Sequence, residues 1–330
     1  MMRSARVFMR FEYERPGDAS VLSRRELSAP SPGPGEATVE VVSAGVNHID
    51  AIIRRGDEPE WDDEPWPRLS GSDFAGIVVA VGAGVTTAAK GTEVIGHVRA
   101  GAHATHVTVA ADTLVVKPRR MSWETAGGLY LAGATALTTL EELRLGRDDT
   151  IVVTAAAGGV GSIEAQIAKH WGAKVIGTCG QRNFDYLRQL GITPVQYGDG
   201  MAERIRRVAG GPVTAFIDNF GQDGQDLAEQ LDVPAGRYRS SADRRRVELS
   251  LLEADPEAVS AGTAKLRRLA RLADDGAFRL LVSGVYRLVD IDEAYEDLEK
   301  LHARGKIVLT TRIAAAYPTL RARDLLETMP

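Results

Sequence analysis

Several features are scarce in this 330-residue sequence, and each scarcity excludes a class of protein. With a single cysteine, Cys179, neither a disulfide framework nor a cysteine-based metal cluster can form. No apolar run reaches the length of about 18 residues that spans a bilayer, and the N-terminus lacks the apolar core of a signal peptide. A net charge of -5 leaves no basic footprint for nucleic acid. We therefore expect a cytoplasmic protein that binds neither nucleic acid nor a membrane.

The residues that are present predict an α/β protein with two domains. Hydrophobic residues make up 44% and charged residues 26% of the chain, as in soluble globular proteins, and the length favours two domains. The first part, up to about residue 118, contains short strand-like runs between turns. These runs are Thr38–Val42, Gly76–Val81 and Thr105–Val109.

From Ala126 onward, apolar strands alternate with helices, and this alternation predicts a doubly wound parallel sheet. The expected strands are Ile151–Val153, Lys174–Thr178, Pro194–Tyr197 and Ala215–Asp218, and the expected helices are Ile163–His170, Phe184–Leu190 and Met201–Val208. The last part begins near Gly284 with a strand, followed by a helix over Asp292–His302 and a strand Lys306–Thr311. We place the domain borders so that 1–118 and 285–330 form one domain and 119–284 form the other.

The stretch Ile151–His170 runs from a strand through a turn of small residues into a helix. In this context glycines let the backbone approach the pyrophosphate of a dinucleotide, which then lies at the positive end of the helix dipole. The turn reads "AAAGGVG", with alanines in place of the first glycine of the usual pattern. Taken alone, the glycines fit close helix–strand packing equally well, but the flanking strands favour a cofactor. The expected contacts are Ala156, Gly158, Gly159, Val160 and Gly161.

The residues after the next strand favour NADPH over NADH. An acidic residue there would bind the ribose 2′-hydroxyl, but the sequence reads "CGQRN". Arg182 would attract a 2′-phosphate, with the Gly180 backbone as a supporting donor. An arginine at the start of a helix opposes the helix dipole, so a plain surface role is less favourable than usual. Asn219, which follows the fourth strand, is a further expected cofactor contact.

Several spaced motifs resemble the medium-chain dehydrogenase/reductases, in particular the zinc-independent quinone oxidoreductase, or zeta-crystallin-like, group. The resemblance covers nearly the whole chain. The motifs that carry it, besides the glycine turn, are Ala29–Asn47, Asp50–Gly56, Pro67–Val85, Leu131–Leu140 and Arg304–Leu309. It implies a GroES-like domain and a Rossmann domain, with the cofactor in the cleft between them, and it implies a homodimer.

The resemblance also assigns positions around the cofactor. It implies that the nicotinamide meets Asn47 and Thr135, and that Tyr197 lies near the 2′-phosphate. The alternative for Tyr197, a half-buried tyrosine at the end of a strand, stays open.

A catalytic zinc site is not expected. Where the alcohol dehydrogenase branch carries zinc ligands, this chain has Asn47, Ser72 and Asp73, none of which supplies an imidazole or a thiolate. The remaining histidines of the first part are interpreted as surface or cleft residues rather than as ligands. They are His48, His97, His103 and His106.

Because the zinc ligands are missing, the expected reaction is hydride transfer from NADPH to a small substrate that is already electron-poor, a quinone or an α,β-unsaturated carbonyl. A donor must then stabilise the developing oxygen charge, and our candidates are Asn47, then His48 and Tyr130. The tyrosine that relatives have two residues after Asp50 is Ile52 here. His48 and Tyr130 stand where relatives have prolines. These two changes either restore a proton donor or reflect neutral drift. A further alternative for His48 is that its side chain points away from the cleft.

Two segments depart from the resemblance. Residues 240–254 are expected to form an altered loop at the cleft, and the C-terminal tail is compatible with a short amphipathic helix that docks on its own domain or on a second subunit. These departures keep two alternatives beside a general quinone or enone reductase. One is a dedicated biosynthetic ene-reductase of secondary metabolism. The other is a non-redox cyclase or binding protein that retains NADPH.

Overall fold

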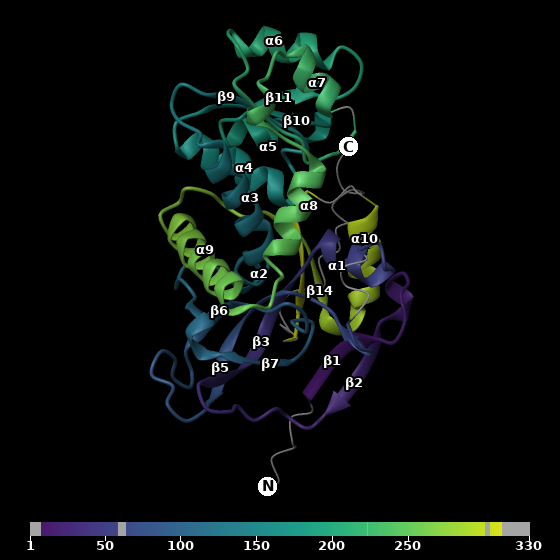
Figure 1. Cartoon of the computed structure of the whole chain (residues 1–330), viewed down its shortest axis with the longest axis vertical. Coiled ribbons are helices and arrows are strands. Elements are labelled where there is room, and N and C mark those ends of the chain that lie inside the picture. Colours follow the sequence, from purple (N-terminus) through teal and green to yellow (C-terminus); the bar gives the residue numbers. More distant parts are fainter. Residues whose placement is uncertain (1–7, 59–63, 223, 301–303, 312–330) are drawn as a thin grey trace. The chain divides into compact units, whose positions relative to one another are not determined.

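The computed structural model describes residues 8–58, 64–222, 224–300 and 304–311, which form two compact units (Figure 1). The first unit comprises the chain up to Leu131, Leu251–Arg271 and the chain from Val282 onward, and the second comprises Ala132–Ser250 and Leu272–Leu281. The domain borders expected after residues 118 and 284 stay a prediction. Among the described residues, the helices lack the combination of length and apolar character that crossing a membrane requires.

The first unit is built on two mostly antiparallel sheets. A small sheet has the order β2-β1-β4, and a larger one has the order β14-β15-β3-β5-β6-β8, with β7 also paired to β3. The strands are β1 (Phe8–Tyr13), β2 (Ser23–Leu27), β3 (Glu36–Val46), β4 (Arg68–Leu69), β5 (Asp73–Val81), β6 (Glu93–His97), β7 (His106–Ala110), β8 (Val115–Val116), β14 (Val282–Arg287) and β15 (Lys306–Thr310). β15 pairs with β3, Val308 opposite Gly45, so the end of the described chain lies in the sheet that its beginning builds.

Helices and 3₁₀ turns complete the first unit. α1 (His48–Arg55) follows β3 directly, and its Ala51 packs with Val46 of β3 and Ile307 of β15 in one buried cluster. The other helices are α2 (Trp123–Gly127), α9 (Pro256–Asp274), which extends into the second unit, α10 (Ile291–Glu299) and the 3₁₀ turns η1 (Ala19–Val21), η3 (Ala111–Thr113) and η6 (Leu288–Asp290). Because α1 starts at the end of β3, its first turn has a fixed position relative to the sheet.

The second unit is a parallel sheet of the order β11-β10-β9-β12-β13. Its strands are β9 (Thr150–Val153), β10 (Lys174–Cys179), β11 (Thr193–Gln196), β12 (Ala215–Ile217) and β13 (Tyr238–Arg239). The connecting helices are α3 (Tyr130–Leu143), α4 (Gly159–His170), α5 (Phe184–Gln189), α6 (Met201–Ala209), α7 (Gly224–Gln230), α8 (Ser241–Ser250) and the 3₁₀ turns η4 (Gln181–Asn183) and η5 (Ala235–Arg237). The chain moves outward in one direction from β9 to β11 and in the other from β12 to β13, so the order reverses between β9 and β12. In such sheets, ligands bind outside the carboxyl ends of the strands at this reversal.

The sequence predicts these elements closely. The four expected strands of the second unit match β9, β10, β11 and β12 to within one residue at each end, and the predicted GroES-like plus Rossmann fold is confirmed. One helix is longer than expected, because α4 begins at Gly159 rather than Ile163, so the glycines themselves form its first turn.

The expectation of an altered loop over residues 240–254 is wrong for most of that segment. Residues 241–250 form the helix α8. The Ser240 hydroxyl accepts the Asp243 N–H at 3.1 Å, and the Asp243 carboxylate accepts the Ser240 N–H at 2.8 Å. This reciprocal capping box starts the helix, and its pattern of serine with an acidic residue three positions later is present in the sequence. The predicted C-terminal helix lies outside the described residues.

Candidate functional site

The turn between β9 and α4 is shaped by close backbone contacts. Ala155 has a φ of +48°, a left-handed conformation that residues other than glycine rarely adopt. The Gly158 N–H donates to the Ala155 carbonyl at 2.8 Å, which closes the turn. A Cβ at Gly161 would lie 2.6 Å from the same carbonyl oxygen, so a side chain there would force the helix away from the turn. Gly161 is therefore required by packing.

The start of α4 is suited to an anion. Gly158 is the N-cap and has no side chain to satisfy the N–H groups of the first turn, and that turn contains no acidic residue. Gly158, Gly159 and Val160 are only half-buried, whereas Ala156 is fully buried and donates its N–H to the Thr178 carbonyl at 3.1 Å. Free N–H groups at the positive end of a helix dipole fit the pyrophosphate of a dinucleotide.

Three of the predicted residues come together at the carboxyl ends of β10 and β11. These strands run parallel with Cys179 opposite Gln196, so the next residues, Gly180 and Tyr197, are neighbours. A Cβ at Gly180 would lie 3.4 Å from the Tyr197 hydroxyl. The Tyr197 side chain is 62% exposed rather than half-buried, and Arg182 is exposed on η4, directly after Gly180. An arginine and a phenol at this sheet edge suit a phosphate ester.

Asn219, at the end of β12, belongs to a buried polar network. Its side-chain N–H donates to Glu164 Oε2 at 2.5 Å, and its backbone N–H donates to the Thr154 hydroxyl at 2.8 Å. Arg244 of α8 donates to the Asn219 carbonyl at 3.1 Å. Asn219, which the sequence predicts to contact the cofactor, thus already makes three hydrogen bonds within the second unit.

Glu164 was not singled out from the sequence. It lies on the buried side of α4, and its Oε1 has no hydrogen-bond partner among the described residues. Burial raises the pKa of its carboxyl to about 7, and the hydrogen bond from Asn219 opposes this shift. The signal that could have revealed it is a carboxylate among the small and apolar residues of a helix that follows a glycine turn.

In the first unit, Asn47 is held by charged neighbours. It is buried as the N-cap of α1, its N–H donates to Asp50 Oδ2 at 3.1 Å, and its side-chain oxygen accepts from Lys306 Nζ at 2.5 Å. Asp73, fully buried, accepts the Leu131 N–H at 3.2 Å. Burial, reinforced by the charge of Asp73, raises the pKa of Asp50 to about 7. The sequence did not reveal Lys306 as a partner of Asn47, because β15 and α1 lie far apart along the chain.

The other predicted donors are placed differently. His48 is exposed at the first position of α1. Tyr130 is buried, its hydroxyl donates to the Leu251 carbonyl at 3.0 Å, and burial raises the pKa of this phenol. Its ring stacks on His97 at 4.1 Å. Thr135, expected near the nicotinamide, is buried in α3.

The histidines of the first unit have separate partners. His97 Nε2 contacts the Thr263 hydroxyl at 2.9 Å, and His103 bonds through Nε2 to the Gly45 carbonyl and through Nδ1 to the Ser70 hydroxyl. Burial lowers the pKa of each imidazole to about 4, which keeps both neutral. Within the described ranges, no three His, Cys, Asp or Glu side chains form a group that could hold a metal ion.

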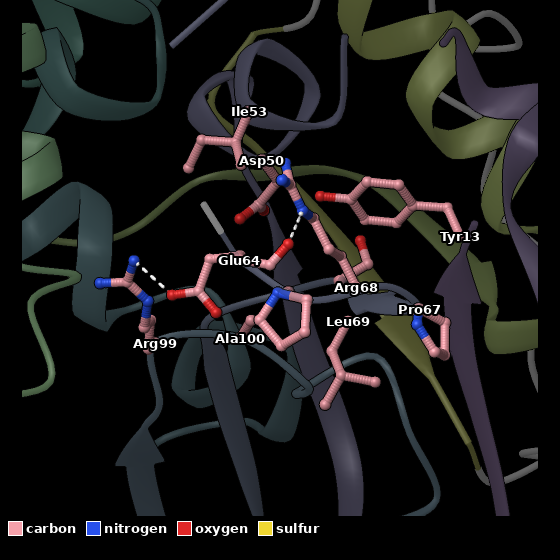
Figure 2. Close-up of a pocket in the computed structure, with 12 residues that line it drawn as sticks. Tyr13, Asp50, Ile53, Glu64, Pro67, Arg68, Leu69, Arg99 and Ala100 are labelled. Carbon is pink, nitrogen blue, oxygen red and sulfur yellow. Dashed lines mark hydrogen bonds and ion pairs between the residues drawn. The ribbon is translucent and has the colours of Figure 1, made fainter. Parts of the chain in front are cut away.

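A cavity of about 290 Å³ opens in the first unit beside α1 (Figure 2). Figure 2 shows the Tyr13 hydroxyl, the Arg68 guanidinium and the Asp50 carboxyl turned toward one another. Burial raises the pKa of Tyr13 to about 12, so its phenol keeps its proton at neutral pH. Arg68 is held by its stacking on Trp66, 4.1 Å from the ring centroid, and by a bond from Nε to the Glu64 carbonyl at 3.0 Å. The cavity therefore joins two hydrogen-bond donors and a carboxyl of raised pKa.

Two family models of dehydrogenases match parts of the chain. Residues 33–129 match the family model of the alcohol dehydrogenase GroES-like domain, and residues 191–309 match that of zinc-binding dehydrogenases. The quinone oxidoreductase of Coxiella burnetii is 25% identical, with a TM-score of 0.77 over 93% of this chain and 100% of that one. Escherichia coli quinone oxidoreductase, solved with NADPH, is 27% identical, with a TM-score of 0.75 over 92% and 99% of the two chains.

Among curated proteins, the chain is similar to parts of much longer polyketide synthases. It is 30% identical to the pikromycin polyketide synthase component PikAII of Streptomyces venezuelae over 89% of its own length and 8% of that protein. A mycocerosic acid synthase-like polyketide synthase of Mycobacterium tuberculosis is 32% identical over 85% of this chain and 14% of the synthase. The chain thus matches only a small part of these proteins.

Proposed function

Because the chain belongs to the medium-chain dehydrogenase/reductase superfamily, with quinone oxidoreductases among its structural neighbours, we propose that it is an NADPH-dependent reductase of quinones or α,β-unsaturated carbonyls. The observation that carries the proposal is the uncapped start of α4 after the glycine turn, because it offers backbone N–H groups to a pyrophosphate. The Escherichia coli quinone oxidoreductase, with which the chain shares this fold, was solved with NADPH.

The sheet edge beside the turn favours a 2′-phosphate. Arg182 and Tyr197 flank the Gly180 backbone there, and the segment from Gly180 to Asn183 contains no acidic side chain that would repel a phosphate. When bound, NADPH supplies a hydride, and the residues of the chain have to hold the substrate and provide a proton.

We place the substrate oxygen in the cavity of the first unit. The Tyr13 hydroxyl and the Arg68 guanidinium would hydrogen-bond the oxygen on which negative charge develops. Asp50, with its pKa of about 7, is partly protonated at neutral pH and would supply the proton that completes the reduction. The donors suggested by the sequence, Asn47, His48 and Tyr130, stay predictions.

A substrate that is already conjugated fits the absence of zinc ligands in the sequence. Ser72 and Asp73 stand where the alcohol dehydrogenase branch supplies metal ligands, so the carbonyl would have to be activated by conjugation and by hydrogen bonds. A homodimer in the cytoplasm is part of the same proposal, and sedimentation equilibrium tests the dimer.

A second candidate, a biosynthetic ene-reductase dedicated to one conjugated intermediate, is favoured by the likeness to two polyketide synthases. The two candidates differ in breadth. A general reductase would oxidise NADPH with many acceptors, and a dedicated one would accept few.

A panel assay tests the class. NADPH oxidation is followed by the loss of nicotinamide absorbance with 1,4-benzoquinone, 9,10-phenanthrenequinone and a series of simple enones. Turnover across the panel supports the general reductase, and turnover confined to one or two enones supports the dedicated one. Tight NADPH binding without turnover of any acceptor, including thioester-linked enones, would favour the non-redox alternative over both.

A further inference from the structure

The loop between β11 and α6 has little intrinsic rigidity. It comprises residues 197–200, "YGDG", and both glycines have positive φ angles, +95° at Gly198 and +73° at Gly200. Glycine loses more conformational freedom on ordering than other residues, so a loop with two glycines needs an external restraint to keep one conformation. All four of its residues are exposed, so burial does not provide that restraint.

The restraint comes from one side chain, Arg204. Its Nε and Nη2 donate to the Gln196 carbonyl at 3.1 and 2.8 Å, Nη2 donates to the Gly198 carbonyl at 3.0 Å, and Nη1 donates to the Asp199 carbonyl at 2.6 Å. A longer contact of 3.4 Å joins Nη2 to the Tyr197 carbonyl. Four consecutive carbonyl groups therefore converge on a single guanidinium.

The position of Arg204 in its own helix is otherwise unfavourable. It lies in the first turns of α6, just after the N-cap Gly200, where a positive charge opposes the helix dipole. The carbonyl groups that it binds belong to the end of β11 and to the loop rather than to α6. The hydrogen bonds of Arg204 therefore stabilise the loop, while its positive charge is unfavourable at the start of α6.

The loop in turn holds Tyr197. The ring lies beside Gly180, where a Cβ would come within 3.6 Å of its Cε1, yet the side chain is 62% exposed. A ring with so much open surface is positioned mainly by its backbone. Arg204 binds the carbonyl groups on both sides of that backbone, those of Gln196 and Gly198.

We propose that Arg204 is a positioning residue for the 2′-phosphate of NADPH, which acts by fixing the loop 197–200 so that Tyr197 lies beside Gly180. The inference rests on the proposed NADPH-dependent function. Because each of its three guanidinium nitrogens donates to a backbone carbonyl of residues 196–199, we assign Arg204 to the positioning of the loop rather than to direct phosphate binding.

Two ligands without a nicotinamide test this inference by calorimetry: 2′,5′-ADP, which carries the 2′-phosphate, and 5′-AMP, which lacks it. The variants are Arg204→Lys, which keeps the charge but not the planar fork, and Arg204→Gln, which removes both. Arg207→Ala, on the exposed side of α6, is the matched control for a lost positive charge. Thermal melting of each variant reports its folding.

We expect both Arg204 variants to raise the Kd for 2′,5′-ADP about tenfold and to change the Kd for 5′-AMP less than twofold, the size of effect of a charge-assisted hydrogen bond. In turnover, KM for NADPH rises and kcat is unchanged. Arg207→Ala leaves all these values within twofold. Arg204→Gln added to Tyr197→Ala has no further effect, because the residue through which Arg204 acts is already gone.

Four results would overturn the inference. Wild-type affinity in Arg204→Lys would mean that only charge matters. Equal weakening of both ligands, or a full additional loss in the double variant, would mean a general structural role. If the wild type itself binds 2′,5′-ADP no better than 5′-AMP, the proposed NADPH preference fails, and the inference about Arg204 fails with it.

Discussion

In the second unit, the features that suit a cofactor are made largely of backbone, whereas the cavity of the first unit is made of side chains. The turn before α4 depends on the carbonyl and the left-handed backbone conformation of Ala155 and on the lack of a side chain at Gly161. The cavity depends on Tyr13, Asp50 and Arg68, which come from β1, α1 and β4. A backbone site is specified by a few adjacent residues, but a side-chain site requires several distant segments to meet.

The largest effect is expected where a side chain is added to the backbone site. Gly161→Val should destabilise the fold by about 3–4 kcal/mol and abolish NADPH binding, because its Cβ would lie 2.6 Å from a carbonyl oxygen. Chemical denaturation and calorimetry measure the two effects. Gly211→Ala is the control, since nothing lies within 4 Å of its added Cβ. A Gly161→Val variant that binds NADPH normally would show that the turn is not limited by backbone packing.

The second unit, whose cofactor features are made largely of backbone, also contains a buried side-chain carboxyl, that of Glu164. Its folded-state pKa is raised from 4.5 to about 7, so its proton stabilises the fold below about pH 4.5 and this contribution is lost as the pH rises through 7. The shift corresponds to on the order of 3 kcal/mol. Glu164→Gln mimics the protonated acid, so it should match the wild type at pH 5 and exceed it in stability at pH 8.

Urea denaturation at the two pH values measures this difference, and Glu229→Gln on the exposed side of α7 is the control. An equal pH dependence in wild type and Glu164→Gln would show that the carboxyl is ionised within the fold.

The 2′-phosphate edge is tested by Arg182→Ala. We expect the Kd for NADPH to rise about thirtyfold and the Kd for NADH to change less than twofold, since one charge-assisted contact is lost. Fluorescence titration of the two cofactors measures this. Arg188→Ala, which removes a surface arginine paired with Asp185, should leave both values unchanged. A parallel loss for NADH would place Arg182 elsewhere on the cofactor.

The smallest effect concerns which tyrosine of the first unit donates a hydrogen bond to the developing negative charge. Tyr13→Phe should lower kcat/KM for an enone about tenfold, because one hydrogen bond to the developing charge is lost. Tyr130→Phe should change it less than twofold, because that hydroxyl donates to the Leu251 carbonyl. Steady-state kinetics with NADPH separates the two tyrosines. The opposite ranking would support the donor predicted from the sequence and reject the one in the cavity.

What the sequence predicts well is local. Strand–helix alternation and the glycine turn lie within stretches of about 20 residues, and the structure places β9 to β12 where the pattern indicates. The helix α8 was also signalled locally, by Ser240 and Asp243, but a comparison with relatives that have a different segment there obscured it.

The cavity could not be predicted in the same way. Nothing in the sequence near Tyr13 indicates that it meets Asp50 and Arg68, because register and crossover decide which ends of β1, α1 and β4 converge. For the same reason, the sequence does not reveal that the side-chain oxygen of Asn47 accepts from Lys306, more than 250 positions away.

The most direct test of the account follows the hydride itself. The protein is incubated with a conjugated enone and NADPH deuterated at C4, in each of its two stereochemical forms, and the product is analysed by mass spectrometry and NMR. We expect deuterium at the β-carbon of the product from one of the two forms only. Consumption of the enone without deuterium in the product, or NADPH that stays unoxidised with every conjugated acceptor, would contradict it.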